Sequence, residues 1–278
     1  MMAAPLAPPR LHRLAALLAY GMTDIGPARD GNEDNLLIDE ALGLAAVADG
    51  MGGHACGEVA SACVLVELRA YLAAHAPALS LTNAEKTVRV DPDVTCPDPA
   101  AGAVQLVHDA VAHANTALYR QNVANRQADG GGMGATLTGF WQPHGSARMV
   151  MFHVGDSRMY CLRGGVLYQL TRDQTLHQQA VEAGMTGNMP ARNMLLQAVG
   201  PSPAIVPEVR AHLVMPGDLL MLCSDGLHGC VPHGDLQDTL LGARSDALDL
   251  ACTRLINLAY RYGGRDNITV LLAACPAG

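Results

Sequence analysis

Three aspartates from distant parts of this chain stand where an apolar segment meets a glycine or an asparagine. Asp49 and Asp225 each follow an apolar run and precede a glycine, whereas Asp266 precedes Asn267 and a further apolar run. Short apolar runs bounded by turn residues are typical of buried strands. Because strand ends can meet at one edge of a packed sheet structure, we expect these three carboxylates to lie close together.

Three carboxylates at close range repel one another strongly in a low-dielectric setting. A divalent cation among them removes this repulsion, and ligands that offer only oxygen favour Mg²⁺ or Mn²⁺ over zinc. The eleven histidines do not alter this interpretation. The pairs His108/His113 and His228/His233 are five residues apart, the wrong spacing for adjacent ligands on one helix face. We interpret these histidines as surface or core residues.

The turn after Asp49 is rich in glycine. Gly50, Gly52 and Gly53 allow positive φ angles and let a ligand approach main-chain atoms that a Cβ would shield. Such a turn could present Asp49 and a backbone carbonyl to a small, hard ion. An ordinary loop between a strand and a helix has the same composition, so this stretch alone leaves both interpretations open. The two aspartate turns downstream favour the metal site.

Composition narrows the class of protein. Half of the 278 residues are hydrophobic, which is enough to fill the core of one large domain. The net charge of −8, without a block of Lys or Arg, argues against nucleic acid and anionic membranes as partners. The eight cysteines include no CxxC pair and mostly lie in apolar runs. This pattern favours buried thiols in a reducing compartment over disulfides or a zinc site.

The N-terminal residues predict a tail rather than a targeting segment. Residues 1–13 contain three prolines and are expected to be flexible. The next apolar run, 14–20, is too short for a membrane span and lacks a cleavage site of the secretory type. We therefore expect a soluble, cytoplasmic protein in which residues 14–275 form a single domain.

Periodicity of apolar residues predicts an α+β fold. Helical spacing occurs over 103–123, over 245–261 with a Ser245 cap, and over 58–75, where the expected inner stripe is Val59, Cys63, Val66, Ala70 and Ala73. Residues 76–102 are rich in proline without a period and predict an exposed insertion.

From residue 135 onward the period changes to two, which predicts a series of short strands. The pair Gly164-Gly165 predicts a two-residue hairpin turn. Together with the strands before the first helix, this gives roughly ten mostly antiparallel strands. Two such sheets packed face to face with helices outside, a four-layer α-β-β-α sandwich, accommodate this order.

Six groups of residues follow one another between about Tyr20 and Leu272. They are Asp24-x-Gly26 with Arg29-x-x-x-Glu33-Asp34, Asp49-Gly50-Met51-Gly52-Gly53-His54, Gly134-Ala135-Thr136-Leu137, Val154-Gly155-Asp156-Ser157-Arg158, Ser224-Asp225-Gly226-Leu227 and Gly264-Arg265-Asp266-Asn267-Ile268-Thr269. This succession resembles the metal-dependent Ser/Thr protein phosphatases of the PPM (2C-type) family in their bacterial form. One such motif would be weak evidence, whereas six in order cover nearly the whole chain.

The resemblance implies a metal centre with defined ligands. Asp49 would bridge two Mn²⁺ or Mg²⁺ ions, and the carbonyl of Gly50 would bind one of them. Asp225 and Asp266 would ligate the other ion. Asp129, four residues before Met133, matches the ligand of a third metal in bacterial members, although beside three glycines it is also consistent with a simple loop residue.

The resemblance also implies residues that support these ligands. Glu33 would hold a metal-bound water, while Asp24 and Asp34 would orient the ligands from behind. Asn267 would position Asp266 or the bound waters. Arg29 would clamp the phosphate, since its planar guanidinium suits bidentate phosphate binding.

Two further residues lie close to these motifs in the sequence and are not assigned as ligands. Asp156 is better explained as stabilising the Gly155 turn, through an Asx-type bond or Arg158, than as a ligand. Thr175 is a possible neighbour of the third metal.

The implied reaction is direct hydrolysis of phosphoserine or phosphothreonine. A water that bridges two cations ionises near neutral pH and attacks phosphorus in line with the departing oxygen, while Arg29 and the metals offset the phosphoryl charge. No cysteine lies in the HCxxxxxR pattern of thiolate phosphatases. Met51 stands where eukaryotic relatives carry a histidine proposed as general acid, so we expect water to protonate the leaving group. Residues 176–193 resemble a short form of the flap of bacterial relatives.

Three functional hypotheses are compatible with the sequence. The first is a phosphatase that acts on phosphorylated proteins and opposes a bacterial Ser/Thr kinase, with the kinase or its substrates as partners. The second is a catalytically silent phosphoprotein-binding module of the same fold. The third is a phosphatase dedicated to one system, such as type VI secretion. The intact carboxylates favour the first over the second, whereas the sequence does not decide the third.

Overall fold

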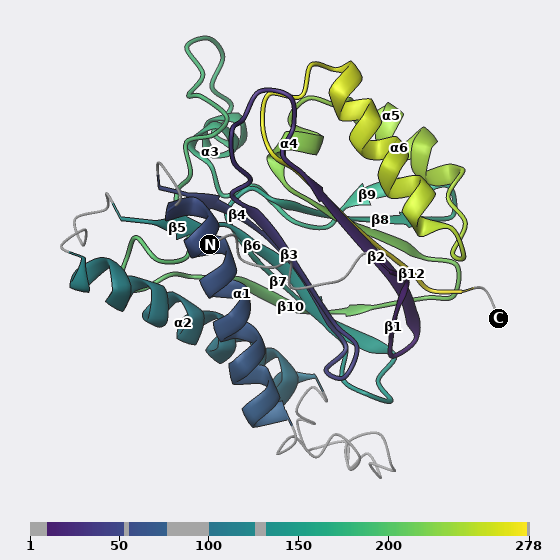
Figure 1. Cartoon of the computed structure of the whole chain (residues 1–278), viewed down its shortest axis with the longest axis horizontal. Coiled ribbons are helices and arrows are strands. Elements are labelled where there is room, and N and C mark those ends of the chain that lie inside the picture. Colours follow the sequence, from purple (N-terminus) through teal and green to yellow (C-terminus); the bar gives the residue numbers. More distant parts are fainter. Residues whose placement is uncertain (1–9, 53–55, 77–99, 126–131, 277–278) are drawn as a thin grey trace.

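Two antiparallel sheets packed face to face form the centre of the molecule (Figure 1). The computed structural model describes residues 10–52, 56–76, 100–125 and 132–276. One sheet has the order β1 (His12–Leu14), β2 (Leu17–Asp24), β12 (Ile268–Ala274), β11 (Leu219–Cys223), β8 (Arg158–Arg163) and β9 (Val166–Gln169). The other has the order β10 (Glu208–Leu213), β7 (Arg148–Val154), β6 (Leu137–Trp141), β4 (Leu44–Met51) and β3 (Asp34–Asp39), and β5 (Gly134–Ala135) pairs with β4.

The central strands are buried on both faces, which explains why they are continuous apolar runs. In β11, Leu220 and Leu222 lie in the core between the two sheets, whereas Met221 and Cys223 lie in the core beneath the helices. Neighbouring side chains of a strand point to opposite faces, so a strand covered on both sides needs apolar residues at every position. The predicted α+β sandwich is confirmed.

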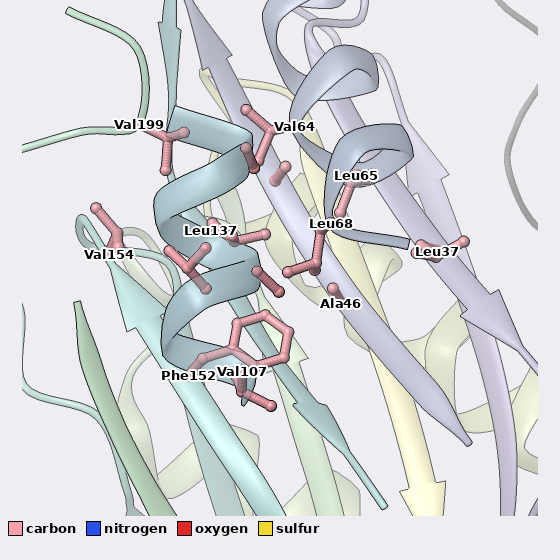
Figure 2. Packing of buried hydrophobic residues seen from close by; sticks show 14 of the residues in the cluster. Leu37, Ala46, Val64, Leu65, Leu68, Val107, Leu137, Phe152, Val154 and Val199 are labelled. Carbon is pink, nitrogen blue, oxygen red and sulfur yellow. The ribbon is translucent and has the colours of Figure 1, made fainter. Parts of the chain in front are cut away.

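Helices cover the outer face of each sheet. The helices α1 (Cys56–His75) and α2 (Ala101–Ala124) pack on the sheet that contains β4, and α5 (His233–Leu241) and α6 (Leu248–Arg261) pack on the sheet that contains β12. Figure 2 shows Leu68 of α1 and Val107 of α2 above Phe152 and Leu137 of the sheet. The short helices α3 (Leu176–Glu182) and α4 (Asp225–His228) lie near one end of the sheets.

The predicted inner stripe of α1 is wrong. Val59 and Val66 are 50% and 46% exposed, and the helix instead buries a stripe on its opposite face that includes Val64, Leu68 and Leu72. The helix carries apolar residues on both faces, and it buries the face with the bulkier leucines because these remove more apolar area from water.

The N-terminal strand also differs from the prediction. Residues 12–13, expected in the tail, belong to β1, and His12 is buried with its Nδ1 2.8 Å from Glu40 Oε1. A positive φ of 47° at Ala15 separates β1 from β2, where the sequence predicted one strand. Residues 1–9 of the tail and most of the predicted insertion, residues 77–99, fall outside the described residues.

Two features of the C-terminal helices were not predicted correctly. The last helix begins at Leu248 after Ala247, so Ser245 is not its cap, and α5 was not predicted as a helix.

The Gly164-Gly165 turn has positive φ at both residues, as the predicted hairpin requires. Among the helices in the described residues, none is long and apolar enough to cross a membrane.

The orientation of α1 can be tested with two valines. Val64→Ala should lower the free energy of unfolding by roughly 2 kcal/mol, because the deletion leaves a cavity in a fully buried site. Val66→Ala removes the same atoms from the exposed face of the same helix and should change it by less than about 0.5 kcal/mol. Urea unfolding followed by circular dichroism measures both, and equal losses would contradict the observed orientation.

Candidate metal centre

Acidic residues from both sheets meet at one edge of the molecule. Asp34 of β3 and Asp49 of β4 are directly paired across the two strands. Asp225 follows β11, and Asp266 precedes β12, the strand that pairs with β11. Burial raises the pKa of Asp49 well above its usual range, and the charges of Asp34, Asp225 and Asp266 raise it further. The structure therefore brings the three predicted ligands into one electrostatic cluster and adds Asp34.

Burial and mutual repulsion disfavour the ionised forms of Asp34, Asp49 and Asp225. Desolvation is the main cause that raises the pKa of Asp34 and of Asp225, and the charge of Asp266 adds to the effect on Asp225. Burial and the nearby Asp225 also raise the pKa of Asp156 to about 7. Positive charge placed among these groups would stabilise their ionised forms.

Unpaired oxygens in the cluster fit a hard cation. Among the buried side chains of the described residues, Asp34 Oδ1 and Asp225 Oδ1 have no hydrogen-bond partner. A buried carboxylate oxygen without a partner is costly unless a cation or a donor reaches it. Among all the residues that the structure describes, no three His, Cys, Asp or Glu side chains are grouped closely enough to enclose an ion by themselves. The donors thus lie at one edge without forming a closed cage.

Arg29 holds Asp266 at the exposed rim of the cluster. Its guanidinium Nη2 donates to Asp266 Oδ2 at 2.7 Å, and the arginine side chain is 48% exposed. The resemblance predicted a contact between Arg29 and phosphate, whereas this structure pairs it with a predicted metal ligand. The hydrogen bond to Asp266 is the main cause that raises the pKa of Arg29, so the guanidinium stays charged.

Asn267 ties the loop that carries Arg29 and Glu33 to the start of β12. Its Oδ1 accepts from the backbone N–H of Glu33 at 2.8 Å, and its Nδ2 donates to the carbonyls of Ile25 and Gly31, each at 2.9 Å. Its own N–H donates to Asp266 Oδ1 at 2.9 Å. One amide side chain therefore fixes two predicted site segments relative to each other.

Asp24 closes the turn that precedes this loop. Its Oδ1 accepts from the N–H of Gly26 at 2.8 Å and from the hydroxyl of Tyr260 at 2.6 Å. The first hydrogen bond stabilises the turn at the end of β2, and the second holds this turn against helix α6.

Ser224 connects the two sheets at the cluster, and the sequence analysis assigned it no role. Its hydroxyl donates to Asp34 Oδ2 at 2.7 Å and accepts from the N–H of Thr269 at 3.0 Å. The only signal in the sequence was its place in the motif beside Asp225. Its partner Asp34, expected behind the ligands, is buried among them.

Thr136 holds the backbone of Asp49. The N–H of Thr136 donates to the carbonyl of Asp49 at 2.8 Å, and the Thr136 hydroxyl accepts from the N–H of Asp49 at 3.0 Å. The same hydroxyl lies 2.7 Å from the Ser157 hydroxyl. Two further motifs thus fix the segment that presents Asp49 and Gly50.

Several other predicted residues have different neighbours from those expected. Arg158 pairs with Asp173 at 2.7 Å rather than supporting Asp156, whose carbonyl accepts from His228 Nε2 at 2.9 Å. Thr175 caps α3, since its hydroxyl accepts from the N–H of Gln178 at 3.1 Å. The predicted third-metal ligand Asp129 lies outside the described residues, as do Gly53 and His54.

A close approach between α1 and the loop of Glu33 explains one glycine. A Cβ on Gly57 would lie 2.6 Å from the Glu33 carboxyl carbon, closer than real side chains come. The carboxyl group of Glu33 therefore occupies the space above the first turn of α1. A Cβ at position 57 would therefore displace the Glu33 carboxyl group, whereas the backbone angles of Gly57 do not require a glycine.

Comparisons with known proteins give consistent matches. A family model described as protein phosphatase 2C matches residues 30–261. The serine/threonine protein phosphatase PstP of Mycobacterium tuberculosis is 33% identical over 267 residues, which cover 94% of this chain. This chain spans about half the length of that relative, 46%. The serine/threonine phosphatase stp of Listeria welshimeri is 33% identical over 258 residues, which cover 90% of this chain and 92% of the relative.

A solved structure resembles the whole fold. The catalytic domain of the serine/threonine protein phosphatase PstP in complex with two manganese ions superposes with a TM-score of 0.72 and 31% sequence identity. The match covers 93% of this chain and 97% of that one.

Metal-free protein should lose thermal stability as the pH rises from about 5 to about 7.5. Carboxyl groups whose folded-state pKa is raised keep protons that the unfolded chain releases. Their contribution to the free energy of unfolding is therefore present at low pH and is lost as the pH rises through the folded-state pKa. Added Mn²⁺ should therefore raise the melting temperature more at the higher pH.

Scanning fluorimetry in chelator, with and without excess Mn²⁺, measures this effect. Asp156→Asn should flatten the pH dependence of the metal-free protein, whereas Asp238→Asn, at an exposed position of α5, should leave it unchanged. A wild-type melting temperature that does not change over this range would contradict the raised pKa values.

Gly57→Ala should weaken Mn²⁺ binding by roughly 10- to 100-fold, because the new methyl group displaces the Glu33 carboxylate. Gly31→Ala is a suitable control, since a Cβ at Gly31 meets nothing within 4 Å. Isothermal titration of both variants measures the affinity. Equal affinities would show that the position of Glu33 does not affect the metal site.

Proposed function

The chain belongs to the protein phosphatase 2C family, and we propose that it is a metal-dependent phosphatase of phosphoserine and phosphothreonine in proteins. The observation that carries this proposal is the buried carboxylate cluster, in which Asp34 and Asp225 each leave one oxygen without a partner. The names and the manganese-bound structure of its relatives support the same activity.

We propose that the predicted ligands hold two ions. We assign Asp49 and the Gly50 carbonyl to one ion, and Asp49, Asp225 and Asp266 to the other. When bound, two divalent cations supply Lewis acidity and ionise a water near neutral pH. Asp34, held by Ser224, adds negative charge beside Asp49, and Glu33 lies over the first turn of α1. We propose that Glu33 holds a water at the edge of the centre.

We propose that Arg29 binds the phosphate. It sits at the exposed rim and already donates to a carboxylate oxygen, a geometry that a phosphoryl oxygen can replace. Transfer of the guanidinium from Asp266 to the substrate would leave Asp266 free to serve as a ligand. The same side chain would then offset charge on the phosphoryl oxygens as the leaving oxygen departs.

We propose that the substrates are proteins modified by a bacterial Ser/Thr kinase, including the kinase itself. Direct hydrolysis is the reaction that fits the cluster, because a water activated by the bound cations would displace the serine or threonine oxygen in one in-line step, without a protein nucleophile. The position of Met51 in β4 leaves water as the proton donor to the departing serine or threonine oxygen.

Substitution of the ligands tests the proposal. Asp49→Asn and Asp225→Asn should each lower hydrolysis of p-nitrophenyl phosphate and of a phosphothreonine peptide by at least about 1000-fold, because each removes charge that holds the cations. Chelation should abolish activity, and Mn²⁺ or Mg²⁺ should restore it. Phosphate release is the measurement.

Asp246→Asn serves as the matched control, because this exposed aspartate pairs only with the nearby Arg244 in the ion pairs that the structure describes. It should retain wild-type activity. Full activity of either ligand variant, or of chelated protein, would refute the metal-dependent mechanism. Wild-type protein that binds phosphopeptide without releasing phosphate would indicate the silent binding module instead.

A further inference from the structure

A cavity of about 530 Å³ opens beside the carboxylate cluster. Asp225 and Asp266 line it, together with residues of α3, of the segment after α3 and of the turn before β12. This volume can hold one or two side chains next to a residue that occupies the centre. The cavity is therefore in position to contact whatever flanks the reacting group.

Two exposed arginines, Arg192 and Arg265, line this cavity. In the described part of the chain, neither takes part in an ion pair, whereas the cavity's third arginine, Arg158, pairs with Asp173. Arg29 lines a different depression, together with Glu33 and Glu58. The cations of the cavity are therefore separate from the arginine that we assign to the reacting phosphate.

The acidic groups of the cavity do not neutralise Arg192 and Arg265. Asp173 is paired with Arg158, and Asp266 with Arg29. The charges of Asp156 and Asp225 both raise the pKa of Asp49, so these two carboxylates lie on the side of the cavity where the predicted metal ligands meet. Polar side chains, among them His177, Gln178 and Asn193, also line the cavity.

We propose that this cavity binds a second anionic group of the substrate, either an acidic side chain or a second phosphate close to the phosphoresidue. This inference rests on the proposed phosphatase function. Arginine binds carboxylate and phosphate with two parallel hydrogen bonds, which favours either group over a neutral side chain. An extended peptide advances about 3.3 Å per residue, so a group two positions away lies roughly 7 Å from the reacting phosphate.

The overall negative charge of the chain is a second reason to assign anion binding to Arg192 and Arg265. A net charge of −8 repels phosphorylated peptides, so local cations are needed to draw an anionic segment toward the centre. Arg192 lies in the irregular segment after α3, and Arg265 lies in the turn before β12. Both are exposed, and their removal breaks no ion pair that the structure describes.

A panel of matched phosphothreonine peptides tests the inference. The peptides carry alanine, aspartate or a second phosphothreonine two positions before or after the reacting residue, and kcat/KM is measured for each. Wild-type protein should prefer the anionic peptides over the alanine peptide. Arg192→Ala and Arg265→Ala should each reduce this ratio by roughly 3- to 10-fold, and the double variant should nearly abolish it.

The ratio within each variant is the decisive quantity, because it is insensitive to general loss of folded enzyme. Arg244→Ala removes an exposed arginine that lies outside the cavity and should leave the ratio at its wild-type value. The aspartate and phosphothreonine peptides distinguish an acidic residue from a second phosphate as the preferred group.

An unchanged ratio in the double variant, or a wild-type enzyme without preference, would overturn the inference. Failure of wild-type protein to hydrolyse even p-nitrophenyl phosphate would instead refute the proposed phosphatase function. The two proposals therefore fail by different results.

Discussion

Mutual repulsion among buried carboxylates is the constraint on which the rest of this structure depends. Asp34 is buried and Asp49 and Asp225 are half-buried at the edge of two sheets, and desolvation raises the pKa of each. Such an arrangement is unfavourable unless protons or cations neutralise it. The fold tolerates this cost because its apolar layers, two between helices and sheets and one between the sheets, supply stability elsewhere.

The hydrogen bonds around the cluster join parts of the chain that are remote in sequence. Asn267 holds the loop of Glu33, Ser224 links Asp34 to the last strand, and Thr136 holds the backbone of Asp49. All three side chains are buried, so their bonds are protected from competing water. The motifs therefore contribute as much by fixing one another's backbone as by presenting charged groups.

The sequence predicted the sandwich and the approach of Asp49, Asp225 and Asp266, because strands, turns and motifs leave local signals. It misplaced the buried face of α1, since that helix has apolar residues on two sides and periodicity alone does not rank them. It assigned no role to Ser224, and it missed the bond between Arg29 and Asp266, because such contacts depend on three-dimensional proximity. For Asp129, outside the described residues, the metal role stays a prediction.

The position of β12 affects the order in which the molecule can assemble. This strand is the last in chain order, yet it lies in the interior of its sheet between β2 and β11. During synthesis, β2 and β11 emerge first and lack the neighbour that joins them. The turn with Asp266 and Asn267 arrives with β12, so the carboxylate cluster cannot form on a nascent chain before nearly all of this domain has been made.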